Sequence, residues 1–255
     1  MIIIKTPKEI EIIKEGGRRL ATILGKISKK VVPNINTKEL DIYAEELIRS
    51  EGDTPSFLNY KPEKYGQAYP ASLCVSINDE IVHGIPNKNT ILKEGDIVSL
   101  DLGLKHQGFY TDMAVTVPVG KIDKRLKKLI QITKESLHLG ILSAKSGNHV
   151  GDLGFVIQEF VEKNGFNVIR DLAGHGVGKK VHEDPLILNF GEKGEGTELK
   201  SGMVLALEPM VTLGSPEIVL SNDGFTYQTK DKQISAHFEH TIVITDNGSE
   251  ILTKE

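Results

Sequence analysis

The sequence holds a single cysteine, Cys74, and no long apolar run, and these two shortages exclude several classes of protein. One thiol forms no internal disulfide, which favours a reducing compartment. No run approaches the roughly 20 apolar residues of a membrane helix. The opening MIIIKTPKEI also lacks the apolar core of a signal peptide. We therefore expect a cytoplasmic protein without a membrane partner.

An excess of one charge is also missing. The chain has 31 Lys and Arg residues against 35 Asp and Glu residues, a formal net charge of −4. This balance argues against DNA as a partner and against a polybasic membrane anchor. The basic run KRLKK at 124–128 is typical of a solvated helix face. Contact with an acidic partner such as ribosomal RNA is the alternative.

The length and apolar content predict one packed unit. The 255 residues suit one large domain or two small ones, and apolar residues recur throughout, which argues against disorder. No linker divides the chain, so we expect a single domain over 1–255.

Helical patterns occur in two pairs. Thr6, Pro7 and Glu9 form a capping pattern ahead of apolar residues spaced by three and four. A second helix is expected to begin near Thr37. Two more helices are expected over 126–141 and 153–161.

Strand patterns follow each pair of helices. They cover 73–77, 96–104 and 109–119, and then 168–172, 203–211 and 237–245. This order predicts an α/β (α+β) fold with a mostly antiparallel sheet, duplicated in halves of about 1–120 and 121–255. Residues 54–70, rich in Pro, Tyr and Gly, are expected to form a long loop, which is more often functional than idle.

Two aspartates mark the most informative stretch, DIVSLDLGLKHQGFYTDMAVTV at 96–117. A hairpin with a four-residue loop at 105–108 would place Asp101 directly opposite Asp112. Two carboxylates so close repel each other unless they share a proton or bind a cation. The alternative is a different register, with both carboxylates exposed.

Two glutamates and a glycine-flanked histidine extend this candidate site. Glu208 lies in MVLALEPMV and Glu239 in SAHFEHTIVIT, where burying an unpaired carboxylate is costly. Neither segment contains Lys or Arg, so metal binding is favoured over a structural ion pair. His175 in AGHGVGKKVHEDP is either a ligand or a turn residue. Together these donors suit a pair of Mn²⁺, Co²⁺, Fe²⁺ or Zn²⁺ ions in a hydrolytic site.

Five motifs taken together resemble the methionine aminopeptidases, and they occur in that family's order. They are CVSINDEIVHGIP, the Asp101…Asp112 hairpin, GHGVGKKVHEDP, LALEPMV and SAHFEHTIVIT. The resemblance covers nearly the whole chain and implies the pseudo-symmetric pita-bread (creatinase/aminopeptidase) fold. The short spacing between Glu208 and Glu239 leaves no room for the insertion of type 2 enzymes, so a bacterial-style type 1 enzyme is implied.

The resemblance also implies roles for individual residues. Asp112 and Glu239 would bridge two divalent metal ions, and the full ligand set would be Asp101, Asp112, His175, Glu208 and Glu239. His83 and His182 would be catalytic histidines that contact the substrate without binding metal, and Glu208 would also accept a proton.

A substrate pocket and a second ion site are implied as well. Cys74, Tyr69 and Phe225 match positions that line the methionine pocket. The 54–70 loop is longer than in familiar members, so Tyr65 is left out of that pocket. Asn78 and Ser235 match positions that bind a monovalent cation in some members.

The implied activity is removal of the initiator methionine from nascent proteins and peptides when the second residue is small. The nucleophile would be a water that bridges the metal ions. The resemblance favours a monomer and allows transient ribosome contact. A proline-specific peptidase of the same fold and a non-catalytic binding protein are the rivals. The complete set of ligands and histidines favours the enzyme.

Overall fold

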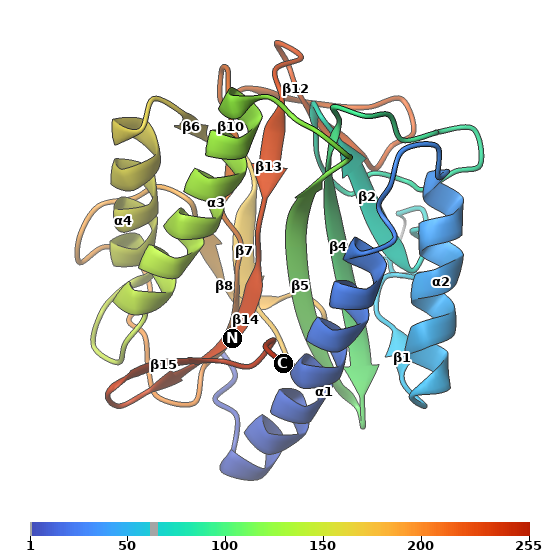
Figure 1. Cartoon of the computed structure of the whole chain (residues 1–255). Coiled ribbons are helices and arrows are strands. Elements are labelled where there is room, and N and C mark those ends of the chain that lie inside the picture. The colour runs from blue at the N-terminus through green and yellow to red at the C-terminus, as the bar shows by residue number, and fades with distance from the viewer. Residues whose placement is uncertain (1, 62–65) are drawn as a thin grey trace.

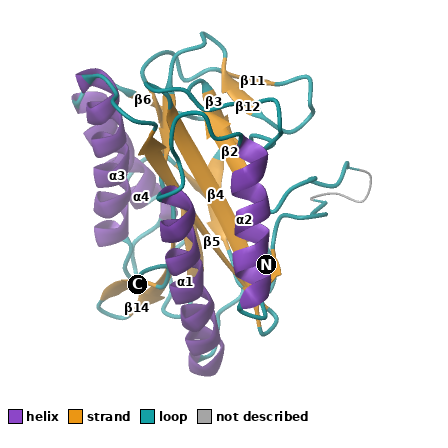
Figure 2. Cartoon of the chain, turned by 45° about the vertical axis from the view of Figure 1, so that its right-hand side comes forward, coloured by secondary structure: helices purple, strands orange, loops and turns teal. Residues whose placement is uncertain are grey.

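The computed structural model describes residues 2–61 and 66–255 (Figures 1 and 2). Tyr65 lies outside the described residues. The helices are α1 Pro7–Ser28, α2 Thr37–Ser50, α3 Lys124–Ser143 and α4 Val150–Lys163. The strands are β1 Thr54–Pro55, β2 Leu73–Ile77, β3 Glu80–Val82, β4 Ile97–His106, β5 Phe109–Pro118, β6 Asn167–Val168, β7 Ala173–Gly176, β8 Glu183–Leu188, β9 Val204–Leu207, β10 Met210–Thr212, β11 Ile218–Leu220, β12 Tyr227–Thr229, β13 Ser235–His237, β14 His240–Thr245 and β15 Gly248–Ile251.

The four helices begin where local capping chemistry allows. At the start of α1, the Thr6 hydroxyl accepts from Glu9 N, and the Glu9 carboxylate accepts from Thr6 N, which is the predicted capping box. Asn36 caps α2 by accepting from Glu39 N. All four predicted helices are therefore confirmed, each within a few residues of its expected bounds.

The strands form antiparallel sheets, and every pairing among the described strands is antiparallel. One sheet joins β1, β4, β2 and β5, and another has the order β15-β14-β9-β7-β8. Two three-stranded sheets have the orders β13-β10-β6 and β11-β12-β3. The mixed α/β class with antiparallel sheets is as predicted, whereas the division into halves near residue 120 stays a prediction.

The helices pack on one face of the strands and leave the other face uncovered by helices (Figure 1). On β4, Leu100, Leu102 and Leu104 pack into one cluster with apolar residues of α1 and α2. Because side chains alternate along a strand, Asp101 and Gly103 point to the opposite face. A second cluster packs α3 and α4 against β9 and its neighbours.

The predicted register of the β4–β5 hairpin is wrong by two residues. His106 pairs with Phe109, so the loop has two residues, Gln107 and Gly108, instead of four. Both have positive φ, 45° and 91°, as a type I′ turn requires. Asp101 therefore lies opposite Ala114, and Asp112 lies opposite Gly103.

Three other predicted strands are shorter or interrupted. The 168–172 strand is reduced to β6. The 203–211 strand breaks at Glu208–Pro209 into β9 and β10, and the 237–245 strand breaks at Phe238–Glu239, between β13 and β14. Pro209 lacks an N–H, which weakens strand pairing at that point.

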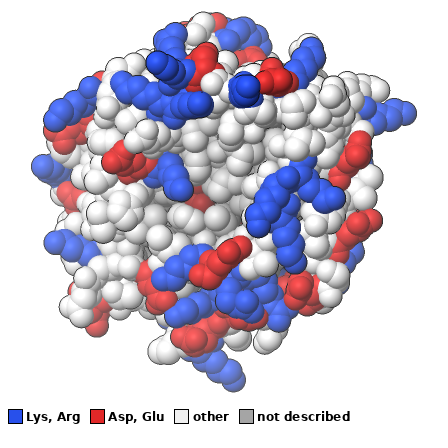
Figure 3. Space-filling view, in the orientation of Figure 1, with Lys and Arg blue, Asp and Glu red and all other residues white. Residues whose placement is uncertain are grey.

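The surface carries no dominant charge on the face drawn in Figure 3, where basic and acidic side chains alternate and a central area between α1 and α3 is mostly uncharged. The basic run 124–128 lies at the start of α3. Lys128 of this run already has a partner within the chain, since its Nζ donates to Asn164 O at 3.0 Å.

Among the described residues, no helix is long and apolar enough to cross a bilayer.

Candidate active site

A cavity of about 470 Å³ lies on the strand face that the helices leave free. It is lined by every residue that the sequence analysis assigned to catalysis, divalent metal or substrate, namely Tyr69, Cys74, His83, Asp101, Asp112, His175, His182, Glu208, Phe225 and Glu239. These residues come from segments more than 150 positions apart in the chain, so the fold alone brings them together.

The two aspartates reach each other by a diagonal contact. Asp101 and Asp112 point to the same face of β4 and β5, two positions out of direct opposition. The two carboxyl groups are still close enough for the charge of Asp101 to raise the pKa of Asp112. Gly103, opposite Asp112, has no side chain, and an added Cβ would lie 3.0 Å from Ser56 and 3.2 Å from Phe57. The glycine thus lets Ser56 and Phe57 close over this face.

The two glutamates lie at the strand interruptions. Glu208 follows β9 directly, and Glu239 lies between β13 and β14, where its N–H donates to Ala114 O at 2.9 Å. Glu208 Oε1 lies 3.6 Å from His175 Nε2. A break in the strand frees the glutamate side chain from simple alternation and turns it into the cavity.

Burial sets the protonation of this cluster. It raises the pKa of Asp101 to about 7 and that of Glu208 to about 8. The pKa values of Asp112 and Glu239 are also well above their usual range, first from burial and then from the neighbouring carboxylates. By themselves, these four groups would hold protons near neutral pH.

A divalent cation fits this cluster. Asp112, His175 and Glu239 each offer a ligand atom within 4.8 Å of the others, and all three are buried. Asp101 Oδ1 and Glu239 Oε1 have no hydrogen-bond partner among the described residues. The His175 ring holds its Nδ1 2.9 Å from Gly176 O, which leaves Nε2 free to bind a metal. Buried carboxylate oxygens without partners are what a cation would satisfy.

The histidines of the cavity are neutral. Burial lowers the pKa of His83 to about 4 and that of His175 to about 3. Desolvation also lowers the pKa of His182, whose ring lies edge-on to that of His175 with centroids 4.5 Å apart. Neutral imidazoles can bind metal or donate a single N–H.

The turn that carries His182 is fixed by a buried ion pair. Glu183 accepts hydrogen bonds from the backbone N–H groups of Lys179 and Lys180. Its other oxygen lies 2.6 Å from Lys5 Nζ, and both side chains are almost fully buried. The segment before α1 thereby holds the residue next to His182.

One end of the cavity is apolar. Tyr69 and Phe225 pack edge-to-face with ring centroids 5.5 Å apart, and Cys74 is buried beside them. The Tyr69 hydroxyl donates to Gly84 O, so its polar end is satisfied away from the pocket. Burial raises the pKa of the Cys74 thiol, which therefore stays neutral.

The residues expected to bind a monovalent cation lie outside this cavity. Ser235 N donates to Asn78 O at 2.8 Å, and Ser235 Oγ lies 3.2 Å from the carbonyl oxygens of Asn78 and Glu80. Asn78 has a φ of 55°, which turns its carbonyl out of the regular strand path.

Sequence reasoning missed two polar neighbours of the site. Tyr60 lines the cavity, and its Oη lies 2.6 Å from His182 Nδ1. The signal was its place in the 54–70 loop. His237 is buried with Nε2 3.4 Å from Glu208 Oε2, and burial lowers its pKa to about 4. The signal was its place two residues before Glu239.

Comparison with known proteins agrees with this geometry. The model of metallopeptidase family M24 matches residues 11–246. A methionine aminopeptidase of Clostridium perfringens is 48% identical, with 99% of each chain covered, and methionine aminopeptidase 1 of Bacillus subtilis is 46% identical over 100% of both. The crystal structure of a methionine aminopeptidase from Thermotoga maritima superposes with a TM-score of 0.95 at 47% identity, with both chains fully covered.

A prolidase from Pyrococcus horikoshii is also similar, with a TM-score of 0.79 and 26% identity, but this chain covers only 64% of it. The chain therefore belongs to metallopeptidase family M24 and, within it, to the bacterial type 1 methionine aminopeptidases. The predicted family resemblance and pita-bread fold are confirmed. Membership of this metallopeptidase family implies a divalent metal cofactor. The buried group of Asp112, His175 and Glu239, which could hold a metal ion, agrees with this.

Proposed function

We propose that the chain removes the N-terminal methionine from nascent proteins and peptides whose second residue is small, by metal-assisted hydrolysis. The observation that carries the proposal is the single cavity in which a buried carboxylate and histidine cluster meets an apolar pocket. The carboxylate and histidine cluster suits hydrolysis at a metal centre, and the apolar pocket suits the binding of a side chain such as methionine.

The proposal includes two divalent ions, of Co, Mn, Fe or Zn. Asp101, Asp112, His175, Glu208 and Glu239, which all line the cavity, would hold them. When bound, the ions supply Lewis acidity that activates water near neutral pH. A monovalent cation near Asn78 and Ser235 is part of the same proposal, supported by the carbonyl oxygens that converge on Ser235.

Three of the chain's own groups would handle protons and charge. Glu208, which lines the cavity with its Oε1 3.6 Å from His175 Nε2, would accept a proton from the attacking water once the metal is bound. His182 would donate an N–H to the carbonyl oxygen as negative charge develops there. His83, kept neutral by desolvation in the cavity, would hydrogen-bond the amide nitrogen of the bond that breaks.

Specificity for methionine would come from the apolar end of the cavity. Tyr69 and Phe225 form its aromatic walls, and the buried Cys74 lines the same cavity opposite Asp101, its partner across β2 and β4. A thioether packs well against aromatic rings, and a closed apolar pocket excludes water from the reaction.

The substrates would be the N-termini of nascent polypeptides in the cytoplasm, handled by a monomer. We also propose that the basic run 124–128 makes transient contact with the ribosome. A salt-sensitive pelleting assay with ribosomes tests it, and unchanged pelleting after neutralising this run would remove the run as a docking site.

Methionine release from a Met-Ala-Ser peptide tests the proposed activity. The protein is stripped with chelator and each candidate metal is added back. We expect metal-dependent release that is lost in Asp112→Ala, and much slower release of leucine from Leu-Ala-Ser. Asp246→Ala, which removes an exposed carboxylate in the turn after β14, is the matched control and should keep full activity. A folded, metal-loaded protein that releases no methionine would overturn the proposal.

A further inference from the structure

A short polar contact inside the cavity that the proposed mechanism leaves unused joins Tyr60 to His182. Tyr60 Oη lies 2.6 Å from His182 Nδ1, and the two rings meet edge-on with centroids 5.2 Å apart. Both residues line the cavity that holds the carboxylate cluster. The contact therefore acts on the ring that faces the reacting groups.

The hydroxyl has the role of donor in this contact. Burial raises the pKa of Tyr60, so its proton is retained near neutral pH. Among the residues that the structure describes, the Tyr60 hydroxyl has no other hydrogen-bond partner that could take this proton. A neutral imidazole carries one N–H, and a hydrogen bond accepted at Nδ1 leaves that proton on Nε2.

Tyr60 is itself held firmly. Asn59 N donates to Tyr69 O and Tyr69 N donates to Tyr60 O, both at 2.9 Å, so the two ends of the loop are tied together beside the cavity. Tyr69 is in turn fixed by its hydroxyl bond to Gly84 O.

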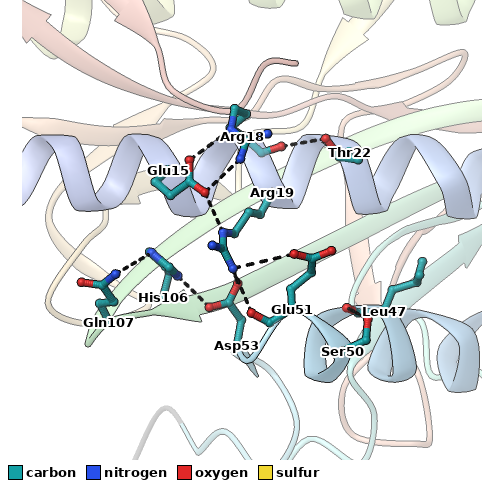
Figure 4. A network of polar contacts seen from close by, with 10 residues as sticks. All are labelled: Glu15, Arg18, Arg19, Thr22, Leu47, Ser50, Glu51, Asp53, His106 and Gln107. Carbon is teal, nitrogen blue, oxygen red and sulfur yellow. Dashed lines mark hydrogen bonds and ion pairs between the residues drawn. The ribbon is translucent and has the colours of Figure 1, made fainter.

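The base of the same segment is fixed by a charged network (Figure 4). Asp53 directly precedes β1, and its Oδ1 lies 2.7 Å from Nδ1 of the buried His106 at the end of β4. Arg19 of α1 links Asp53 to Glu15 and contacts Glu51 at the end of α2. The segment 54–60 thus leaves a rigid corner and reaches the cavity over a few residues.

We propose that Tyr60 is a positioning residue that donates its hydroxyl hydrogen to His182 Nδ1 and thereby holds the ring as the Nε2–H tautomer, ready to donate to the substrate carbonyl. This inference rests on the proposed function for the role of His182. The tautomer itself is a property of the protein alone. Since Nδ1 and Nε2 lie on different sides of the imidazole ring, fixing Nδ1 toward Tyr60 directs Nε2 away from it.

Long-range proton–nitrogen spectra of ¹⁵N-histidine-labelled protein, loaded with diamagnetic Zn²⁺, test the tautomer. We expect His182 to show a protonated Nε2 and an unprotonated Nδ1, and Tyr60→Phe to shift the ring toward a mixture of tautomers. Tyr43→Phe, a tyrosine that packs against the α1–α2 cluster, is the control and should leave the His182 signals unchanged. A protonated Nδ1 in the wild type, or no change in Tyr60→Phe, would overturn the proposal.

A double-mutant cycle on methionine release supplies the kinetic arm. We expect Tyr60→Phe to lower kcat by about 10- to 100-fold, the range for losing a partner that orients a functional histidine. KM should change by less than about twofold, and the kcat effect should vanish in a His182→Ala background. Equal losses in both backgrounds would contradict action through His182. If the protein releases no methionine at all, the proposed function fails, and the tautomer measurement still decides the role of Tyr60.

Discussion

At the scale of single residues, the buried carboxylates make the stability of the metal-free chain depend on pH. Asp101 and Glu208 have pKa values of about 7 and about 8, far above those of carboxylates in an unfolded chain. The folded state therefore binds more protons than the unfolded state at neutral pH. Its stability must fall as the pH rises through these folded-state values.

We predict that the melting temperature of the metal-free protein falls by about 5 °C or more between about pH 7.5 and about pH 9. This window is chosen because His83 and His175, with lowered pKa values, are neutral in the folded state there and almost entirely neutral in the unfolded chain, where the pKa of histidine is about 6.5. Below it, the same histidines act in the opposite direction, since the unfolded chain then binds the extra protons. Thermal unfolding monitored by circular dichroism measures the effect.

The matched variant is Glu208→Gln, which removes one of the titrating groups. Its melting temperature should fall less over the same pH range. A steeper fall in the variant, or a wild-type stability that rises with pH, would contradict the assignment of raised pKa values to the cluster.

At the scale of secondary-structure elements, α1 packs unusually close to the end of the chain. A Cβ added to Gly17 would lie 2.4 Å from the backbone oxygen of Leu252. By contrast, a Cβ added to Gly25 of the same helix would meet only the flexible carboxylate of Glu255, at 3.3 Å. Replacing each glycine by alanine raises helix propensity at both positions, but it causes a backbone clash only at Gly17. Comparing the two variants therefore separates the effect of helix propensity from that of packing.

We predict that Gly17→Ala destabilises the protein by about 2 kcal/mol, because a backbone oxygen cannot move aside as a side chain can. Gly25→Ala should be neutral or stabilise by up to about 1 kcal/mol, since alanine is the better helix former. Urea unfolding of both variants measures the difference. Equal effects at the two positions would mean that the close approach of Leu252 is not limiting.

The same scale shows how far the sequence alone could predict the structure. The helices follow from apolar periodicity and capping residues, which are local, and all four were predicted. The hairpin register failed because Gln107 is not a typical residue for positive φ, although Gly108 is. Glu208 and Glu239 were placed inside strands because alternation of side chains does not reveal where a strand breaks.

The family resemblance carried by five motifs predicted the residues that now line one cavity, including Tyr69 and Phe225, which lie outside those motifs. Tyr60 and His237 were missed for a different reason. Their roles depend on contacts across the fold, with His182 and Glu208, and neither contact leaves a pattern in the local sequence.

At the scale of the whole molecule, the proposed ligands come from both parts of the chain. Asp101 and Asp112 lie on β4 and β5, whereas His175, Glu208 and Glu239 come from the strands after α4. A metal ion bound by both groups would link the two sets of strands. It would bind the folded state and not the unfolded one, so it would raise stability by mass action.

We predict that Mn²⁺ at about 100 times its dissociation constant stabilises the chelator-stripped protein by about 2.7 kcal/mol and raises its melting temperature by about 5 °C or more. Differential scanning calorimetry at constant pH measures the shift. Asp112→Ala should lose most of it, whereas Asp246→Ala should keep it. A full shift in Asp112→Ala would place the stabilising ion elsewhere.

The ion pair between Lys5 and Glu183 has a consequence for how the molecule is made. Lys5 is synthesised 178 residues before its partner Glu183. The turn that carries His182 can be locked only after residue 183 has been synthesised and has folded back onto the start of the chain. Contacts of such long range form late and slowly. A chain that ends before Glu239 therefore holds many of the residues of the cavity but cannot yet arrange them as one site.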